Sequence, residues 1–125
     1  MFINSEKSVV ILFFFFAQFA YTQTDHVFEQ YLDGDYHSLT SSSFKVNSIY
    51  LASAHTHLDE YDKAEALFFL VKKEDKKTAL YLNEKGFLLL KMYQLDQAKL
   101  NFEETLKLNP DYIQAKDMIK YIENN

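Results

Sequence analysis

The chain has 125 residues, a length that suits one domain better than two. Hydrophobic residues make up 48%, which excludes the disordered class, and the presence of only two Gly and one Pro favours helices joined by short connections. The net charge is −5 and every positive side chain is Lys, so nucleic acid, which Arg-rich basic surfaces bind, is not an expected partner.

The N-terminal segment (1–22) has the pattern of an export signal. Residues 9–17 form an unbroken apolar run after a polar start that carries Lys7. A membrane-spanning helix needs roughly 20 apolar residues and a secretory signal about 7–15, so the run fits the shorter class. Small residues at Ala20 and Thr22 predict cleavage after Thr22. We therefore expect a secreted or periplasmic protein.

Two other interpretations of this segment stay open. Left uncleaved, residues 9–20 would anchor the protein in a membrane, and Glu6 beside Lys7 weakens the positive charge that signal peptides carry. The segment could also form a buried first helix of the fold. A membrane contact is expected only if the segment is uncleaved.

Residues 23–44 are expected to form an N-terminal helical segment. Asp33-Gly34-Asp35-Tyr36 resembles the turn between two helices. Tyr36 lies only 25 residues before Tyr61, which is too close for the 34-residue period found downstream, and the Thr-Ser-Ser-Ser run at 40–43 is poor helix material. The expectation is a degenerate partial repeat, with a short helix, a turn and a truncated second helix over 25–44.

A period of 34 residues runs through the middle of the chain. Small or large side chains of one kind recur at this spacing in the pairs Ala52 and Gly86, Asp62 and Asp96, Ala64 and Ala98, and Phe68 and Phe102. Between these positions, the steps of three and four from Tyr61 to Val71 and from Leu95 to Thr105 each define one face of a helix.

With these residues the chain resembles the tetratricopeptide repeat (TPR) family, whose signature has a small residue in the first helix, Ala-x-x-x-Phe in the second, and then Pro. Residues 79–112 match at all of these places, including Pro110, whereas residues 45–78 match without the Pro, which Lys76 replaces. The resemblance implies an all-α fold, a short α-solenoid of antiparallel helix pairs. Two repeats are marginal alone, so the flanking helices are expected to contribute to stability.

The final segment (113–125) is expected to be a capping helix. Pro110 and Asp111 mark the end of one helix and the opening of the next, because Pro interrupts a helix but suits its first turn. Upstream of it, the run from Phe87 to Leu90 is apolar almost all round, which predicts a helix covered on several sides.

Few residues are arranged for catalysis, and we expect a non-catalytic protein without metal or cofactor. His55 and His57, beside Asp59 and Glu60, are two apart and would point to different faces of a helix, whereas zinc-binding helices use a spacing of four. A His-dependent metal enzyme stays a distant alternative. The absence of Cys excludes thiol chemistry and disulfides.

Two charged runs have simple interpretations. Glu103-Glu104 is expected to be solvated on an outer helix. The run Lys72–Lys77 contains four Lys but two acids interrupt it, and lysines suit the C-terminal end of a helix, so solvation is again preferred over an anion-binding surface.

The family resemblance implies that the first helix of each repeat lines a concave groove for a protein or peptide partner. The corresponding positions in this chain are Ile49, Ser53, Thr56, Asn83, Phe87 and Leu90. This set is more apolar than the carboxylate-binding grooves of some members, so a helix or extended segment with apolar anchors is the expected ligand. Coverage of the groove by the N-terminal helices is the open alternative. The expected function is an exported adaptor or scaffold, with a membrane-anchored subunit of an envelope complex as the alternative.

Overall fold

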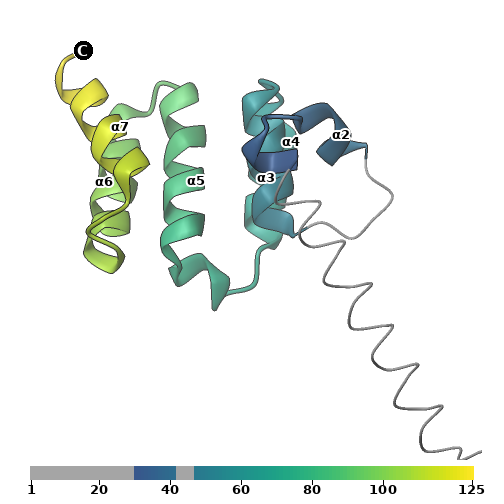
Figure 1. The fold of residues 1–125 in the computed structure, drawn as a ribbon, viewed down its shortest axis with the longest axis horizontal. Coiled ribbons are helices and arrows are strands. Elements are labelled where there is room, and N and C mark those ends of the chain that lie inside the picture. The colour runs from purple at the N-terminus through teal and green to yellow at the C-terminus, as the bar shows by residue number, and fades with distance from the viewer. Residues whose placement is uncertain (1–29, 42–46) are drawn as a thin grey trace, which may run out of the picture. The chain divides into compact units, whose positions relative to one another are not determined.

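The computed structural model describes residues 30–41 and 47–125, and every regular element within them is helical (Figure 1). The predicted all-α class is thereby confirmed for these ranges. The chain divides into two units, one before Asn47 and one comprising Asn47–Asn125, which we describe separately. The predicted export signal and the Thr-Ser-Ser-Ser run from position 42 onward lie outside the described residues.

The described part of the first unit holds a helix end, a turn and α2 (Tyr36–Thr40). Gly34 lies in the left-handed region, with φ of 74°, which glycine adopts without a steric cost. The N–H of Gly34 donates to the carbonyl of Tyr31 at 3.2 Å, and the N–H of Asp35 donates to that of Gln30 at 2.9 Å. α2 has five residues, which agrees with the short second helix expected here.

The second unit contains two helical hairpins and a final helix (Figure 1). α3 packs on α4, α5 packs on both α6 and α3, and α7 packs on α6. The elements are α3 (Ser48–His57), α4 (Tyr61–Leu70), the 3₁₀ turn η1 (Asp75–Lys77), α5 (Ala79–Lys91), α6 (Leu95–Leu108) and α7 (Ile113–Glu123). None of the helices in the described ranges is long and apolar enough to cross a membrane.

The turns inside the two hairpins share one geometry. Each contains a non-glycine residue in the left-handed region, Asp59 in the first and Tyr93 in the second, both with φ of 61°. In each turn the N–H of this residue donates to the carbonyl three positions earlier, at 3.1 and 3.0 Å, and the following N–H donates to the carbonyl five positions earlier, at 2.9 Å in both. The turn at Gly34 has the same two bonds, so this way of ending a helix occurs three times in the described chain.

The core of the second unit consists of two hydrophobic clusters, and α5 contributes to both. Leu88 belongs to the first cluster, with Ile49, Ala52, Ala64, Phe68, Val71 and Tyr81. Phe87, Leu89 and Leu90 pack against the second cluster, which is formed by Ala98, Phe102 and Ala115. The apolar run on α5 is therefore covered on several sides, as its sequence predicts.

Gly86 sets the distance between α5 and α6. A Cβ atom at this position would lie 2.9 Å from Cε1 of Phe102 and 3.2 Å from Cβ of Asn101. Phe102 is fully buried and has little room to move. The close approach of these two helices thus depends on the absence of a side chain at position 86.

The connection after α6 differs from the expected one. Pro110 lies in a turn, and the final helix begins at Ile113 with Tyr112 as its N-cap, so Pro110 does not open the helix. The N–H of Asp111 instead donates to Oδ1 of Asn109 at 3.2 Å, and the N–H of Tyr112 donates to the Asn109 carbonyl, also at 3.2 Å. Asn109 thus supplies both acceptors of a turn that delays the helix start.

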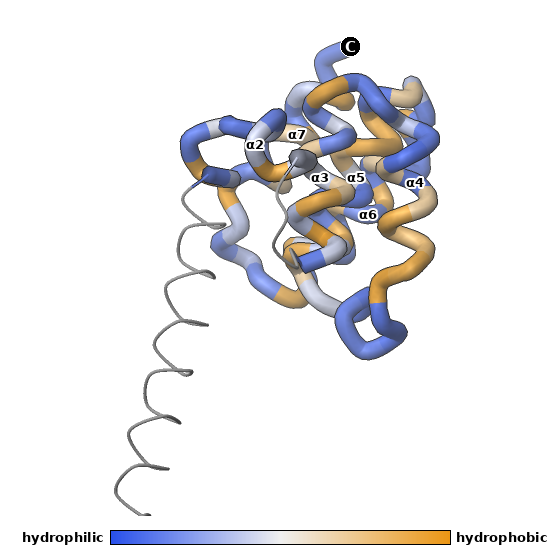
Figure 2. The backbone as a smooth tube through the Cα atoms, turned by 90° about the vertical axis from the view of Figure 1, so that its right-hand side faces the viewer, coloured by the Kyte–Doolittle hydropathy of each residue, from blue (hydrophilic) through white to orange (hydrophobic). Residues whose placement is uncertain are grey.

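Hydrophobic residues are also found at the surface at the end of α4. Figure 2 shows an apolar stretch of α4 that runs directly into the hydrophilic connection before α5. Phe69 and Leu70 in this stretch are 78% and 70% exposed, so they contribute little to either core cluster.

Candidate functional site

An open pocket with a volume of about 880 Å³ lies in the second unit. Its lining comes from α5, α7, the turn between α5 and α6, and the first residues of α4 and α6. The lining residues are Tyr61, Phe87, Leu90, Lys91, Met92, Tyr93, Leu95, Met118, Tyr121 and Asn125. The set is largely aromatic and aliphatic, as is typical of a site that receives an apolar group.

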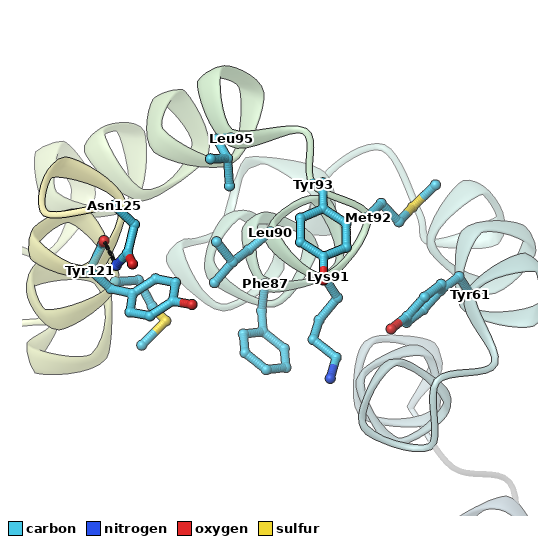
Figure 3. Close-up of a pocket in the computed structure, with 10 residues that line it drawn as sticks. Tyr61, Phe87, Leu90, Lys91, Met92, Tyr93, Leu95, Tyr121 and Asn125 are labelled. Carbon is cyan, nitrogen blue, oxygen red and sulfur yellow. Dashed lines mark hydrogen bonds between the residues drawn. The ribbon is translucent and has the colours of Figure 1, made fainter.

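Figure 3 shows how the side chains surround the pocket. Phe87 lies near its middle, with Tyr121 on one side and Lys91 and Tyr61 on the other. The side-chain amide of Asn125 donates to the backbone carbonyl of Tyr121 at 2.7 Å, which ties the chain after α7 back to that helix. Phe87 and Tyr121 are 34 residues apart in the sequence.

Charged and polar groups fix one rim of the pocket. Nζ of Lys91 lies 3.0 Å from Oδ1 of Asp59, and the hydroxyl of Tyr61 donates to the same oxygen at 2.9 Å. The hydrogen bond from Lys91 lowers the pKa of Asp59, and the same bond raises the pKa of Lys91. The end of α5 is thereby connected to the turn before α4, and the two rings Tyr61 and Phe87 are held on either side of Lys91.

His57 supports Phe87 from α3. The two ring centroids are 4.8 Å apart and the planes are inclined by 32°. Burial lowers the pKa of His57, while the nearby carboxylate of Glu84 acts in the opposite direction. A neutral imidazole stacked on a phenyl ring makes His57 part of the packing beneath the pocket.

The six residues predicted to line a groove are divided by the structure. Phe87 and Leu90 line the pocket and are partly exposed. The other four are buried, and their side chains lie at 3% exposure or less: Ile49, Ser53, Thr56 and Asn83. Ile49 belongs to the first core cluster, and the Thr56 hydroxyl donates to the carbonyl of Ala52 within its own helix at 2.9 Å.

Ser53 and Asn83 take part in polar contacts between first helices. The hydroxyl of Ser53 donates to Oε2 of Glu84 at 2.6 Å, joining α3 to α5. Nδ2 of Asn83 donates to Oε1 of Gln114 at 2.9 Å, joining α5 to α7. Both pairs are separated by 31 residues. Asn83 Oδ1 is buried without a hydrogen-bond partner in the structure.

Two tyrosines lie near this polar group. Burial raises the pKa of Tyr112 to about 12, and the carboxylate of Glu84 and the Tyr50 phenol add to the effect. The pKa of Tyr50 is raised by the same two causes, burial first and then Glu84. The region between α3, α5 and α7 thus favours neutral phenols and contains one buried carboxyl group.

The two histidines considered for metal binding make different contacts. Nδ1 of His55 lies 3.4 Å from Oε1 of Glu60, whereas His57 stacks on Phe87. In the described ranges, no group of three or more His, Asp or Glu side chains is placed to hold a metal ion. Glu103 and Glu104 are exposed on α6, as expected, and Glu104 pairs with Lys107 at 2.5 Å.

Sequence reasoning missed most of the pocket, including Tyr61, Tyr93, Met118 and Tyr121 as lining residues. One signal was available, since the 34-residue period carries Phe87 onto Tyr121. No comparable signal identifies Tyr93, which comes from a turn. Comparison of the chain with protein-family models, with curated proteins and with solved structures found no match.

Proposed function

We propose that this chain is a short, non-catalytic array of TPR-type repeats that binds a protein partner at the pocket between α5 and α7. The observation that carries the proposal is the pair of matching turns at Asp59 and Tyr93, which lie 34 residues apart and share both hydrogen bonds. A shared turn with small residues at Ala52 and Gly86 is typical of stacked helix pairs, whose use is to present a surface for binding.

The proposed site is narrower than the groove inferred from the resemblance. Phe87 and Leu90 remain in it, and Tyr121, Met118 and Tyr93 join them. Rigid aromatic rings provide contact area with little loss of side-chain freedom, and the flexible thioether of methionine adapts to the shape of a ligand. The partner class that fits is a helix or extended peptide with an apolar anchor side chain.

Two exposed residues of the final helix offer a matched test. Tyr121 lines the pocket and is 54% exposed, whereas Ile113 on the same helix is 71% exposed and does not line it. Peptides selected by phage display on the full chain would be measured by fluorescence polarisation against Tyr121→Ser and Ile113→Ser. We expect at least about a tenfold loss of affinity for Tyr121→Ser, as for an aromatic hot spot, and little change for Ile113→Ser.

The result is interpreted together with helicity, measured by circular dichroism. Equal loss of binding in both folded variants, or in neither, would contradict the pocket as the site. Selection of no peptide at all would contradict a peptide-binding function.

We also propose that the protein is exported, on the apolar run at 9–17 and the small residues Ala20 and Thr22. The N-terminus of the protein recovered from cells decides between the two destinations. A mature chain that begins at Gln23 supports a secreted or periplasmic protein, whereas detection of Met1 supports a membrane-anchored subunit of an envelope complex.

A further inference from the structure

The end of α4 has apolar side chains where α6 has charged ones. Phe69 and Leu70 are 78% and 70% exposed, and the residues 34 positions later are Glu103 and Glu104, which are also exposed. Positions of this kind are solvated on α6, so internal packing gives no reason for Phe and Leu on α4. A group outside the chain has to account for them.

Four lysines follow this apolar pair directly. Residues 72–77 contain Lys72, Lys73, Lys76 and Lys77 with two acids, a local net charge of +2 in a chain whose total charge is −5. Charges more than about 10 Å away are largely screened at 0.1 M salt, so a surface that meets this loop experiences its local positive charge.

Lys76 fixes the loop against the apolar pair. Its Nζ donates to the carbonyl of Phe69 at 3.0 Å and lies 5.3 Å from the centre of the Phe69 ring. The bond caps the end of α4, where a cation is also favoured by the helix dipole. Phe69 and the lysine loop are therefore held together as one surface.

We propose that Phe69, Leu70 and the lysines of 72–77 form a site that docks on an anionic lipid surface. We call these residues the α4 tip. Phe and Leu would enter the interface between headgroups and acyl chains, while the lysines contact acidic headgroups. The acids Asp62 and Glu65 lie earlier on α4, away from its C-terminal end, so the helix meets the membrane with its positive end.

Other occupants fit this surface less well. A second copy of the chain would bring two loops of like charge together. A stable protein interface buries about 800 Å² on each partner, which two apolar side chains do not supply, whereas a lipid surface requires only a small wedge and a few cations.

The absence of Trp from the chain allows a direct test with the full protein. Phe69→Trp places a single fluorophore in the α4 tip, and Leu100→Trp places one at a 52% exposed position on α6. Both variants keep the same N-terminal segment, so any membrane binding by residues 9–20 is common to them. Vesicles of phosphatidylcholine with and without phosphatidylglycerol are then added to each.

We expect a blue shift and quenching by brominated lipid for Phe69→Trp with the anionic vesicles, weaker at high salt, and neither for Leu100→Trp. Adding Lys72→Gln, Lys73→Gln and Lys77→Gln to Phe69→Trp should abolish the shift. Equal shifts with neutral vesicles, or no shift with either kind, would overturn the proposal. So would a blue shift without lipid that grows with protein concentration, because it would indicate a protein contact. None of these readouts depends on the pocket between α5 and α7.

Discussion

Asp59 and Tyr93 hold the same left-handed backbone conformation although neither is glycine. A side chain in this conformation costs about 1–2 kcal/mol for most residues, and less for Asp than for Tyr. Asp59 gains an ion pair with Lys91 and a hydrogen bond from Tyr61. Tyr93, which is 88% exposed, instead lines the pocket. Strain retained at an exposed aromatic residue is common where that residue serves binding.

Tyr93→Gly should therefore make the protein more stable and a weaker binder. Relief of the left-handed strain, reduced by the greater freedom of glycine in the unfolded chain, should raise the free energy of unfolding by about 0.5–1 kcal/mol. Urea denaturation measures this change, and the peptide assay measures binding. Asp59→Gly is the matched control, where loss of the Lys91 pair offsets part of the gain. A less stable Tyr93→Gly protein would contradict the strain argument.

Gly86→Ala should destabilise the fold. Overpacking against Phe102 costs about 1–3 kcal/mol, and the higher helix propensity of Ala returns about 1 kcal/mol, so the net loss is up to about 2 kcal/mol. Lys120 is exposed and lies 34 residues after Gly86, so Lys120→Ala is the control and should change stability by less than about 0.5 kcal/mol. Urea denaturation of both variants decides the matter, and a stabilised Gly86→Ala protein would show that α6 can move away.

Acid should weaken the packing beneath the pocket through His57. Its pKa is lowered in the folded protein, mainly by burial, from an ordinary value of 6.5. The unfolded chain then binds the proton more readily, so the contribution of His57 to stability is complete above pH 6.5 and is lost as the pH falls below it. Melting temperatures across this range should fall less in His57→Gln than in the parent. His37→Gln, at an exposed position on α2, is the control and should leave the profile unchanged.

Ser53→Ala should reveal the strength of the contact between α3 and α5. The variant removes a buried 2.6 Å hydrogen bond to Glu84 and should lower the free energy of unfolding by about 1–3 kcal/mol. Thr56→Val is the control, because that hydroxyl bonds only to the Ala52 carbonyl within α3 and its loss should cost less. A double-mutant cycle with Glu84→Gln isolates the pair, and a coupling energy near zero would mean that the bond adds nothing.

The helical class follows from spacing because helix faces repeat every three to four residues. Ala64, Phe68 and Val71 are buried on one face of the first hairpin, as are Ala98, Phe102 and Thr105 in the second. These positions depend on the period of the helix and on contact with the adjacent helix, both of which are local properties. The start of the last helix was misplaced because Asn109 captures the turn through its side chain, a contact that the Pro110 rule does not contain.

The candidate site was less predictable because exposure depends on distant neighbours. Asn83 and Ser53 occupy positions that the family pattern marks as groove-lining, but both are buried here, with partners 31 residues away in the sequence. The pocket draws single residues from several elements, such as Tyr61 and Tyr93, and nothing in their local sequence indicates a common location.

The position of α5 between two core clusters bears on how the second unit unfolds. Leu88 packs with residues of α3 and α4, and its neighbours Phe87 and Leu89 pack with residues of α6 and α7. Separation of either hairpin therefore exposes apolar surface on α5, so neither can open without a cost to the other. Hydrogen exchange in the core of this unit should proceed through a single cooperative opening, with the slowest amides of both hairpins sharing one free energy.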